Sequence, residues 1–324
     1  MSTALVTGIT GQDGLYLSRL LLDKGYEVYG LIRGQNNPKL PVVQELLPEV
    51  KLVEGDLTDL PGLVRALQVA NPDEIYNLGA ISFVAYSWNN PIVTADTTGM
   101  GVLNLLEAIR LWAGDDIDRV RFYQASTSEM FGKVQEVPQR ETTLLWPRSP
   151  YGVSKTFGHY MTINYRESYG LHASSGILFN HESPLRGKEF VTRKISTAVA
   201  RIALGLQDTV TLGSLDAKRD WGFAGDYVDA MWRMVQQPEG SEYVVATGET
   251  HSVREFVESA FAHVGIDDWE PYVLQDPRFM RPAEVELLIG DATKAKEILG
   301  WEPTVTFDGL VKMMVDADLE REKA

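Results

Sequence analysis

Apolar runs alternate with amphipathic stretches over the first half of the chain. The run Ala4-Leu5-Val6-Thr7 precedes a glycine-rich turn, and Leu17, Leu20 and Leu21 then recur at the spacing of one helix face. Further runs typical of buried strands lie at 27–32, 51–53, 74–77, 121–125 and 171–178, and helical patterns lie between them at 59–70, 96–113 and 149–169. Strands that alternate with helices predict an α/β fold with a doubly wound parallel sheet.

The pattern changes after about residue 180. Elements become shorter and irregular, and Pro184, Gly187, Gly213 and Gly222 interrupt them. The pattern still predicts a strand at 243–246 and helices at 252–264 and 306–320. We expect two lobes. Residues 1–180, with returning segments near 210–250, form the first; residues from about 181 to 324 form most of a smaller α/β lobe, which is not strictly contiguous.

The turn after the first strand, Gly8-Ile-Thr-Gly11-Gln-Asp-Gly14, has the features of a dinucleotide-binding loop. Glycines there let the backbone turn tightly and approach a pyrophosphate, and the helix N-terminus then faces the phosphates. Thr10, Gln12 and Asp13 lie within the same loop. The first lobe is therefore predicted to be a Rossmann-type domain that binds a nicotinamide dinucleotide, and the second lobe to bind the substrate.

The end of the second strand bears on the choice of dinucleotide. A carboxylate there would hold the ribose 2′-hydroxyl of NAD, whereas an Arg accommodates the 2′-phosphate of NADP. The chain has Leu31-Ile32-Arg33-Gly34-Gln35-Asn36 at this place, with no carboxylate. The sequence therefore favours NADP over NAD. The alternative is that Arg33 is a solvated surface charge.

Composition excludes several classes of protein. The chain has 324 residues and a net charge of −15, and such an acidic surface argues against a nucleic-acid partner. It has no cysteine and no histidine pair at metal-ligand spacing, so we expect no disulfide and no metal site. No apolar run approaches the roughly 18 residues that span a bilayer, and the N-terminus does not resemble a signal peptide. We expect a cytoplasmic protein with no membrane partner.

Tyr151 and Lys155 lie four positions apart in a predicted helix and so share one face. A phenol with a pKa of about 10 is a poor base at neutral pH, but a nearby ammonium favours the phenolate. We therefore expect Lys155 to lower the pKa of Tyr151 and make it a base for a sugar or alcohol hydroxyl. Upstream, Ser126-Thr127-Ser128-Glu129 adds a carboxylate that can act on a carbon acid. Glu129 as a surface carboxylate is the alternative.

Longer motifs carry a resemblance to a known family. They are GITGQDG (8–14), YNLGA (76–80), FYQASTSEMFG (122–132), PRSPYGVSK (147–155), NYRESYG (164–170), GILFNHESPLRG (176–187), FVTRK (190–194), RDWGFAGDYV (219–228), RPAEVELLIGD (281–291) and LGWEP (299–303). Together they resemble the GDP-mannose 4,6-dehydratase family of the extended short-chain dehydrogenase/reductase superfamily. The likeness covers nearly the whole chain.

The resemblance implies an NADP-dependent hydro-lyase. Tyr151 would take the proton of the sugar 4-hydroxyl while the C4 hydride passes to a tightly held NADP⁺. Lys155 would also hold the nicotinamide ribose, and Thr127 would hydrogen-bond the oxygen at C4. Glu129 would remove the C5 proton and help water leave from C6. The hydride would then return to C6, which converts GDP-D-mannose to GDP-4-keto-6-deoxy-D-mannose.

The resemblance also implies binding roles for other positions. For the cofactor they are Gly8, Thr10, Gly11, Gln12, Asp13, Gly14, Arg33, Asp56, Leu57, Leu78, Ala80, Ser82, Tyr151, Lys155, His181 and Arg186. For the GDP-sugar they are Ser82, Ser128, Glu129, Asn180, Val191, Lys194, Gly213, Arg219, Arg281 and Glu284. Arg219 and Arg281 suit a diphosphate, because a guanidinium can bind two oxygens at once. A salt bridge to a neighbouring carboxylate is the alternative for each.

One segment departs from the family pattern. Close relatives often carry a basic, serine-rich loop with a second Arg after the second strand, where this chain has Gly34-Gln35-Asn36-Asn37-Pro38-Lys39. In the family that loop touches the 2′-phosphate and can reach a neighbouring subunit. The superfamily implies a homodimer through helices around 90–113 and 149–170, and a homotetramer is the second expectation.

Three other functions remain open at this stage. A nucleotide-sugar 4-epimerase would use the same Tyr/Lys pair but needs no base at C5, so Glu129 argues against it. A 4-keto-sugar reductase would need an exchangeable reduced cofactor. A non-catalytic dinucleotide sensor on the same fold has no need of the Tyr/Lys/Thr/Glu set.

Overall fold

The computed structural model describes residues 1–34, 37–279, 285 and 287–323. The strands are β1 Thr3–Thr7, β2 Glu27–Ile32, β3 Lys51–Glu54, β4 Glu74–Asn77, β5 Arg121–Thr127, β6 His172–Leu178, β7 Asn180–Glu182, β8 Val210–Leu212, β9 Lys218–Arg219, β10 Trp221–Phe223, β11 Glu242–Val245, β12 His251–Ser252 and β13 Val273–Gln275. The α-helices are α1 Gln12–Asp23, α2 Leu40–Leu46, α3 Leu60–Ala70, α4 Val84–Asn89, α5 Pro91–Thr94, α6 Gly101–Ala113, α7 Pro150–Tyr169, α8 Val191–Ala203, α9 Ala224–Gln236, α10 Val253–His263 and α11 Phe307–Lys323.

A parallel sheet organises the first lobe. Its order is β11-β6-β5-β4-β1-β2-β3, and every pair of neighbours is parallel. The chain runs outward from β1 in both directions, so the sheet is doubly wound as predicted. Strand β11, at 242–245, returns from far along the chain to complete it.

Helices cover both faces of this sheet. One apolar core lies between the sheet and α1 and α9, and a second lies between the sheet and α3, α6 and α7. Strand β4 is buried along its whole length. Burial without alternation, which at 74–77 includes the polar Glu74 and Asn77, is what a strand covered on both faces shows.

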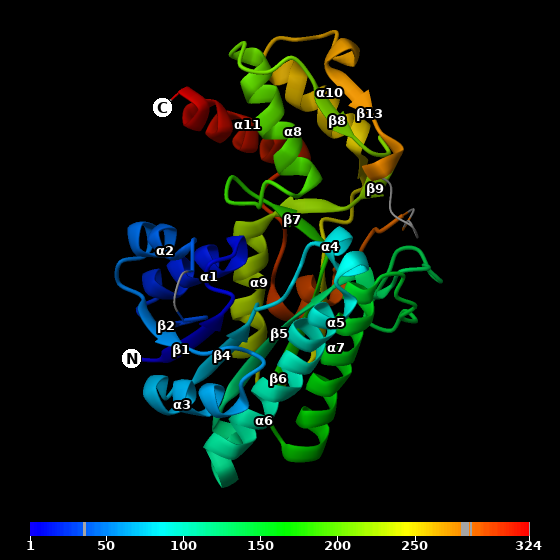
Figure 1. The fold of residues 1–324 in the computed structure, drawn as a ribbon. Helices are drawn as coiled ribbons and strands as arrows, with labels where there is room; N and C mark the ends of the chain where they lie inside the picture. The colour runs from blue at the N-terminus through cyan, green and yellow to red at the C-terminus, as the bar shows by residue number, and fades with distance from the viewer. Residues whose placement is uncertain (35–36, 280–284, 286, 324) are drawn as a thin grey trace.

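The second lobe stands over the carboxyl ends of the strands (Figure 1). A third apolar core joins α8, α10 and α11 in this lobe, and the pairs β12-β9 and β13-β8 flank it. Cavities at the carboxyl ends of parallel strands are where α/β proteins bind ligands.

Two regular helices contradict the expectation of short, irregular elements after residue 180. Helices α8 and α9 are each 13 residues long. In α8 the buried Ile195, Val199 and Ile202 recur at helical spacing, but Arg193 is buried beside them. The buried Arg193 interrupts the apolar pattern of α8, and the Gly and Pro residues nearby are typical of loops, so the sequence does not indicate a helix here.

Candidate active site

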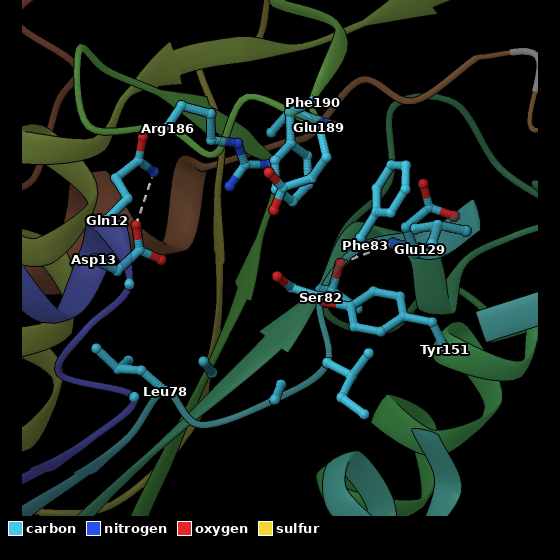
Figure 2. A pocket seen from close by; sticks show the side chains of 18 of the residues that line it. Gln12, Asp13, Leu78, Ser82, Phe83, Glu129, Tyr151, Arg186, Glu189 and Phe190 are labelled. Atoms are coloured by element: carbon cyan, nitrogen blue, oxygen red, sulfur yellow. Dashed lines mark hydrogen bonds between the residues drawn. The ribbon is translucent and has the colours of Figure 1, made fainter. Parts of the chain in front are cut away.

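A large cavity lies between the two lobes, with a volume of about 930 Å³. Its floor is made by residues that follow the sheet strands, among them Gly8 after β1, Leu78 after β4 and Phe179 after β6. Figure 2 shows side chains of both lobes pointing into it, with Tyr151 and Glu129 on one side and Gln12 and Asp13 on the other.

The backbone of the glycine turn is open to a ligand, because Gly8 and Gly14 leave no room for side chains. Gly8 has φ +70°, and a Cβ on it would lie 2.8 Å from the backbone of Gly79. A Cβ on Gly14 would lie 2.4 Å from the carbonyl oxygen of Gly8. Helix α1 begins at Gln12 without a side-chain cap. The bare backbone and uncapped helix N-terminus fit a pyrophosphate.

An ion pair closes the far side of this turn. His181 Nε2 lies 2.7 Å from Asp13 Oδ2, and His181 Nδ1 lies 2.8 Å from the Phe179 carbonyl oxygen. Burial works against both charges, yet the His181 charge lowers the pKa of Asp13 to about 2, and the Asp13 carboxylate raises the pKa of His181. The pair joins the phosphate turn to the segment that enters the second lobe.

The start of α7 places Tyr151 and Lys155. Ser149 caps the helix by accepting the Gly152 N–H at 3.0 Å, and Pro150 occupies the first turn. Tyr151 and Lys155 are then buried one turn apart. Lys155 Nζ donates to the Ala125 carbonyl oxygen at 2.7 Å, and burial lowers the pKa of Lys155 to about 8.

The net effect of the protein is to raise the pKa of Tyr151, contrary to the sequence-based expectation. Burial raises the pKa of Tyr151 above its usual value; the hydrogen bond with Thr127 acts to lower it, and the Glu129 charge raises it further. Lys155 Nζ is 5.9 Å from the centre of the Tyr151 ring and is directed at Ala125 instead. The physical reason is that both groups are deeply buried, so desolvation outweighs their attraction.

Thr127 and Glu129 stand at the end of β5. The Thr127 hydroxyl accepts the Glu129 N–H at 3.3 Å, which fixes the short 3₁₀ turn Ser128–Met130. Both side chains line the cavity that Tyr151 lines. Glu129 is only 8% exposed, so the reading of Glu129 as a surface carboxylate does not hold. The Thr127 hydroxyl and the Glu129 carboxylate thus line the same cavity as Tyr151 and Lys155.

Basic side chains line both ends of the cavity. Arg33 lies after β2 with Asn37 and Lys39 close by in the lining. In the second lobe Lys194 and Arg219 line the wall, and Arg219 is buried. Arg186 also lines the cavity. Its guanidinium carbon lies 3.6 Å from the centre of the Phe190 ring, and its Nε lies 3.0 Å from Glu182 Oε2 in an ion pair. These cations suit phosphate-bearing ligands in an otherwise acidic protein.

The structure gathers the predicted site residues in one place. All of those that it describes line the cavity: Gly8, Thr10, Gly11, Gln12, Asp13, Gly14, Arg33, Asp56, Leu57, Leu78, Ala80, Ser82, Thr127, Ser128, Glu129, Tyr151, Lys155, Asn180, His181, Arg186, Val191, Lys194, Gly213 and Arg219. Arg281 and Glu284 lie outside the described residues. Their common location is an observation, whereas their individual roles stay predictions.

Sequence reasoning missed several lining residues. Phe83 and Phe190 approach each other from opposite lobes, with ring centres 5.7 Å apart, and Glu189, Arg278 and Lys39 also line the cavity. Phe190 lies in the matched motif FVTRK and could have been found there. Phe83 and Arg278 have no signal in the sequence, because only the fold brings them to the cavity.

Comparison with known proteins identifies the family. The profile described as GDP-mannose 4,6 dehydratase matches residues 5–314. The chain belongs to the GDP-mannose 4,6-dehydratase family. GDP-mannose 4,6 dehydratase 1 of Arabidopsis thaliana is 54% identical over 99% of this chain and 90% of its own length. GDP-mannose 4,6 dehydratase of Homo sapiens is 50% identical over 98% of this chain and 92% of its own length.

Solved structures agree with the GDP-mannose 4,6-dehydratase assignment at the level of the fold. DesIV, a dTDP-glucose 4,6-dehydratase from Streptomyces venezuelae solved with NAD bound, is 26% identical and has a TM-score of 0.83. The match covers 98% of this chain and 97% of that chain. The predicted family and the predicted Rossmann-type fold are thus confirmed, and the dehydratase is supported over the epimerase and the reductase.

Metal clusters and membrane-spanning helices are both absent from the part of the chain that the structure describes. No group of three or more His, Cys, Asp or Glu among residues 1–34, 37–279, 285 and 287–323 is arranged to hold a metal ion. Within the same part of the chain, none of the helices has the length and apolar character needed to cross a membrane.

Proposed function

We propose that the cavity converts GDP-D-mannose to GDP-4-keto-6-deoxy-D-mannose, with Tyr151 and Glu129 carrying the proton transfers and Thr127 and Lys155 assisting them. The observation that carries this proposal is the placement of Glu129 beside Thr127 and Tyr151 in one cavity of a chain of this family. The reaction removes one water and has no net oxidation. Catalysis therefore depends on proton transfers at three adjacent sugar carbons.

Tyr151 takes the proton of the 4-hydroxyl in its phenolate form, which the positive charges of Lys155 and of a bound oxidised nicotinamide would favour against the effect of burial. Thr127 hydrogen-bonds the same oxygen and holds it toward Tyr151. An oxidised nicotinamide, when bound, would supply the hydride chemistry: it would accept a hydride from C4 and give it back at C6. Lys155, buried beneath the site, holds the ribose of the cofactor and keeps a positive charge near Tyr151. Burial of these groups excludes water, which keeps the phenol and the sugar oxygen in direct contact.

Glu129 works at the two carbons beyond the ketone. A ketone at C4 makes the C5 proton acidic, and the Glu129 carboxylate removes it. The C6 hydroxyl leaves as water when it receives that proton, and a C5–C6 double bond forms. The proton transfer to the C6 oxygen leaves Glu129 as a carboxylate, so it must take up a second proton, equivalent to the one that the 4-hydroxyl released to Tyr151. Glu129 delivers that proton to C5 when a hydride is added at C6, and the sum of the steps is the loss of one water. An epimerase at C4 has no use for this carboxylate.

The protein binds a nicotinamide dinucleotide, and we infer that NADP is preferred over NAD. Arg33 and Lys39 line the end of the cavity beyond β2, where no carboxylate follows the strand. Two cations there suit a 2′-phosphate. Titration of the protein with NADPH and NADH should give a lower Kd for NADPH. Arg33→Ala should abolish most of that difference, and equal affinities in the unaltered protein would refute the preference.

The substrate is a GDP-sugar, and the second lobe is proposed to bind its nucleotide. Arg219 and Lys194 line that wall of the cavity with Asn180, Val191 and Gly213. The diphosphate is assigned to Arg219, because its guanidinium can contact two oxygens. This part of the proposal also places dinucleotide binding in the first lobe and substrate binding mainly in the second.

The protein is proposed to form a homodimer through α5, α6 and α7. On α7, Val153, Phe157 and Tyr160 are 55%, 39% and 54% exposed and lie on one stripe. Ile92 on α5 is 76% exposed, and these helices lie on one flank of the sheet (Figure 1). An apolar surface of this kind on a water-exposed flank is typical of an interface.

Incubation with GDP-mannose tests the function directly. The protein, with NADP present and no reductant added, should yield a product lighter than the substrate by one water in mass spectrometry. Recovery of a product of unchanged mass, as a C4 epimer has, would refute the proposal. A requirement for added NADPH in stoichiometric amount would point to the reductase instead.

A further inference from the structure

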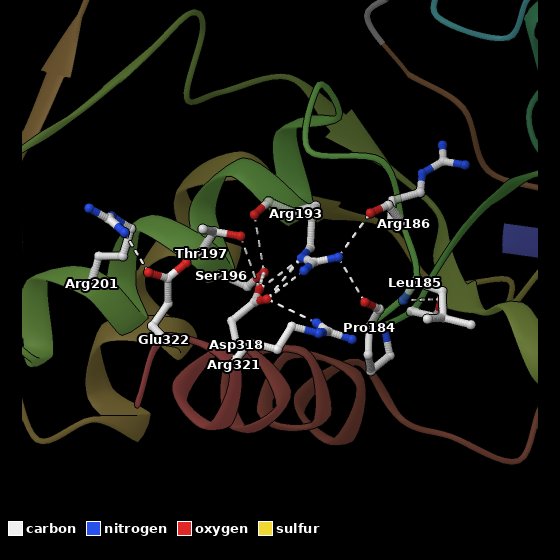
Figure 3. Close-up of polar contacts among 11 residues, drawn as sticks. Pro184, Leu185, Arg186, Arg193, Ser196, Thr197, Arg201, Asp318, Arg321 and Glu322 are labelled. Carbon is white, nitrogen blue, oxygen red and sulfur yellow. Dashed lines mark hydrogen bonds and ion pairs between the residues drawn. The ribbon is translucent and has the colours of Figure 1, made fainter. Parts of the chain in front are cut away.

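A buried ion pair joins α8 to the C-terminal helix α11 outside the cavity (Figure 3). The Arg193 and Asp318 side chains are only 7% and 2% exposed. Arg193 donates to Asp318 from Nε at 2.9 Å and from Nη2 at 2.6 Å, and Ser196 donates to the same carboxylate at 2.7 Å. Burying two charges costs desolvation free energy that can offset their attraction, so a buried pair is weak evidence for a gain in stability. We therefore consider what else the pair does.

The other side of Arg193 faces a loop of the active site. Its Nη1 donates to the carbonyl oxygens of Pro184 at 2.7 Å and Arg186 at 2.9 Å. The planar guanidinium therefore holds the carboxylate of α11 on one edge and two loop carbonyls on another. A lysine ammonium is a point charge on a flexible stem and cannot keep this arrangement.

The loop held in this way carries Arg186 into the cavity. The Arg186 side chain lines the cavity, where it pairs with Glu182 and lies over the Phe190 ring (Figure 2). Next to it, Ser183 donates to Gln12 in the glycine turn at 2.7 Å. The backbone that Arg193 binds is thus continuous with a segment that contacts the phosphate turn.

We propose that Arg193 and Asp318 are positioning residues for Arg186, through which the C-terminal helix controls affinity for the dinucleotide. Neither residue lines the cavity, so neither touches a ligand. Asp318 orients the guanidinium of Arg193, the guanidinium holds the carbonyls of residues 184 and 186, and this places the Arg186 charge. The inference rests on the proposed function only in its assumption that a nicotinamide dinucleotide binds beside Arg186.

Arg193→Lys is the sharpest variant, because it keeps a positive charge opposite Asp318 while giving up the two-sided contact. We expect its Kd for NADPH, measured by the change in cofactor fluorescence, to rise about tenfold. Its kcat at saturating cofactor should stay near that of the unaltered protein. Asp318→Asn should shift the Kd in the same direction. Because the readout is binding, it does not depend on turnover.

Glu322→Gln provides a matched control in the same interface. Glu322 of α11 pairs with Arg201 of α8 beside the Arg193 pair, but neither contacts the loop at 184–186 (Figure 3). We expect Glu322→Gln to leave the NADPH Kd unchanged. An equal loss in Glu322→Gln would show that general packing of α11 matters and would overturn the proposal.

A double-mutant cycle decides whether the effect passes through Arg186. Arg186→Ala should weaken NADPH binding, and Arg193→Lys should add little to it, because residues that act through one another are not additive. Fully additive losses, or wild-type affinity in Arg193→Lys, would overturn the proposal. If the unaltered protein binds NADPH but does not dehydrate GDP-mannose, the proposed function fails while this cycle still gives its answer.

Discussion

At the residue scale, the chemistry depends on what burial does to the groups around Tyr151. Burial raises the pKa of Tyr151 and lowers that of Lys155, so both groups are displaced toward their neutral forms. Glu129 shares this space and is held by the turn that follows Thr127. A phenol and a carboxylate in one buried site can act at two different carbons without exchanging roles.

Replacing Glu129 separates the two halves of the cycle. Glu129→Gln keeps the shape of the side chain but removes the base for C5, so the overall rate should fall by roughly 10²- to 10⁴-fold. Cofactor and sugar affinity should change little. The check is steady-state turnover together with absorbance at 340 nm, which reports whether a hydride has left the sugar. Turnover near the level of the unaltered protein would remove Glu129 from the mechanism.

The pH profile tests the charge on Lys155. Its pKa of about 8 means that the ammonium is present below pH 8 and is lost as the pH rises through that value. If the charged form supports catalysis, kcat/KM should fall on the alkaline side with an apparent pKa near 8, since this ratio reports groups of the free enzyme. A profile that stays flat up to pH 9.5 would contradict this assignment.

At the scale of elements, the turn between β1 and α1 shows how backbone geometry makes a binding site. Gly14 packs against the Gly8 carbonyl and Gly8 packs against the backbone of Leu78 and Gly79, with no room for a Cβ on either glycine. The N-terminus of α1 therefore faces the cavity, and no side chain caps it.

Gly14→Ala should weaken dinucleotide binding by tenfold or more, because its Cβ would lie 2.4 Å from the Gly8 carbonyl oxygen and 2.6 Å from Ile9 Cα. NADPH titration, with a thermal melt to confirm folding, measures the effect. Gly99→Ala is the control, since its Cβ would meet its nearest atom at an ordinary 3.5 Å. Unchanged NADPH affinity in Gly14→Ala would show that the turn does not hold the phosphates.

The sequence predicted elements well where one signal dominated. Strands β2 and β4 are found at the predicted 27–32 and 74–77, because β-branched and aromatic residues such as Val28, Ile75 and Tyr76 favour a strand. Helix α8 was missed because Arg193, buried by its pair with Asp318, interrupts the apolar face. The two residues are 125 positions apart, and no local pattern can reveal such a partner. The same holds for Phe83, which meets Phe190 across the cavity.

The motifs located the candidate site, but the electrostatics needed the fold. Tyr151 and Lys155 share a helix face, as their spacing predicts, yet Lys155 donates to Ala125 on β5. The depth of burial, which decides the direction of a pKa shift, is a property of the packed lobes.

At the scale of the whole molecule, two lobes enclose the cavity and α5, α6 and α7 leave an apolar flank exposed. Phe157→Glu, placed in the centre of that flank, should convert a dimer to the 36.1 kDa monomer, because a buried unpaired carboxylate opposes association. Sedimentation velocity at micromolar concentration gives the answer. Two findings would each contradict the proposed dimer: a monomer without any substitution, or a dimer that tolerates the change.

In the proposed mechanism, one hydride leaves C4 and returns to C6 while water is lost between the two transfers. GDP-mannose with deuterium at C4, incubated with catalytic amounts of NADP and no reductant, tests this mechanism. We expect a product that has lost one water and retains the deuterium at C6. Recovery of the label at C4 in a product of unchanged mass, or its loss from the sugar, would contradict it.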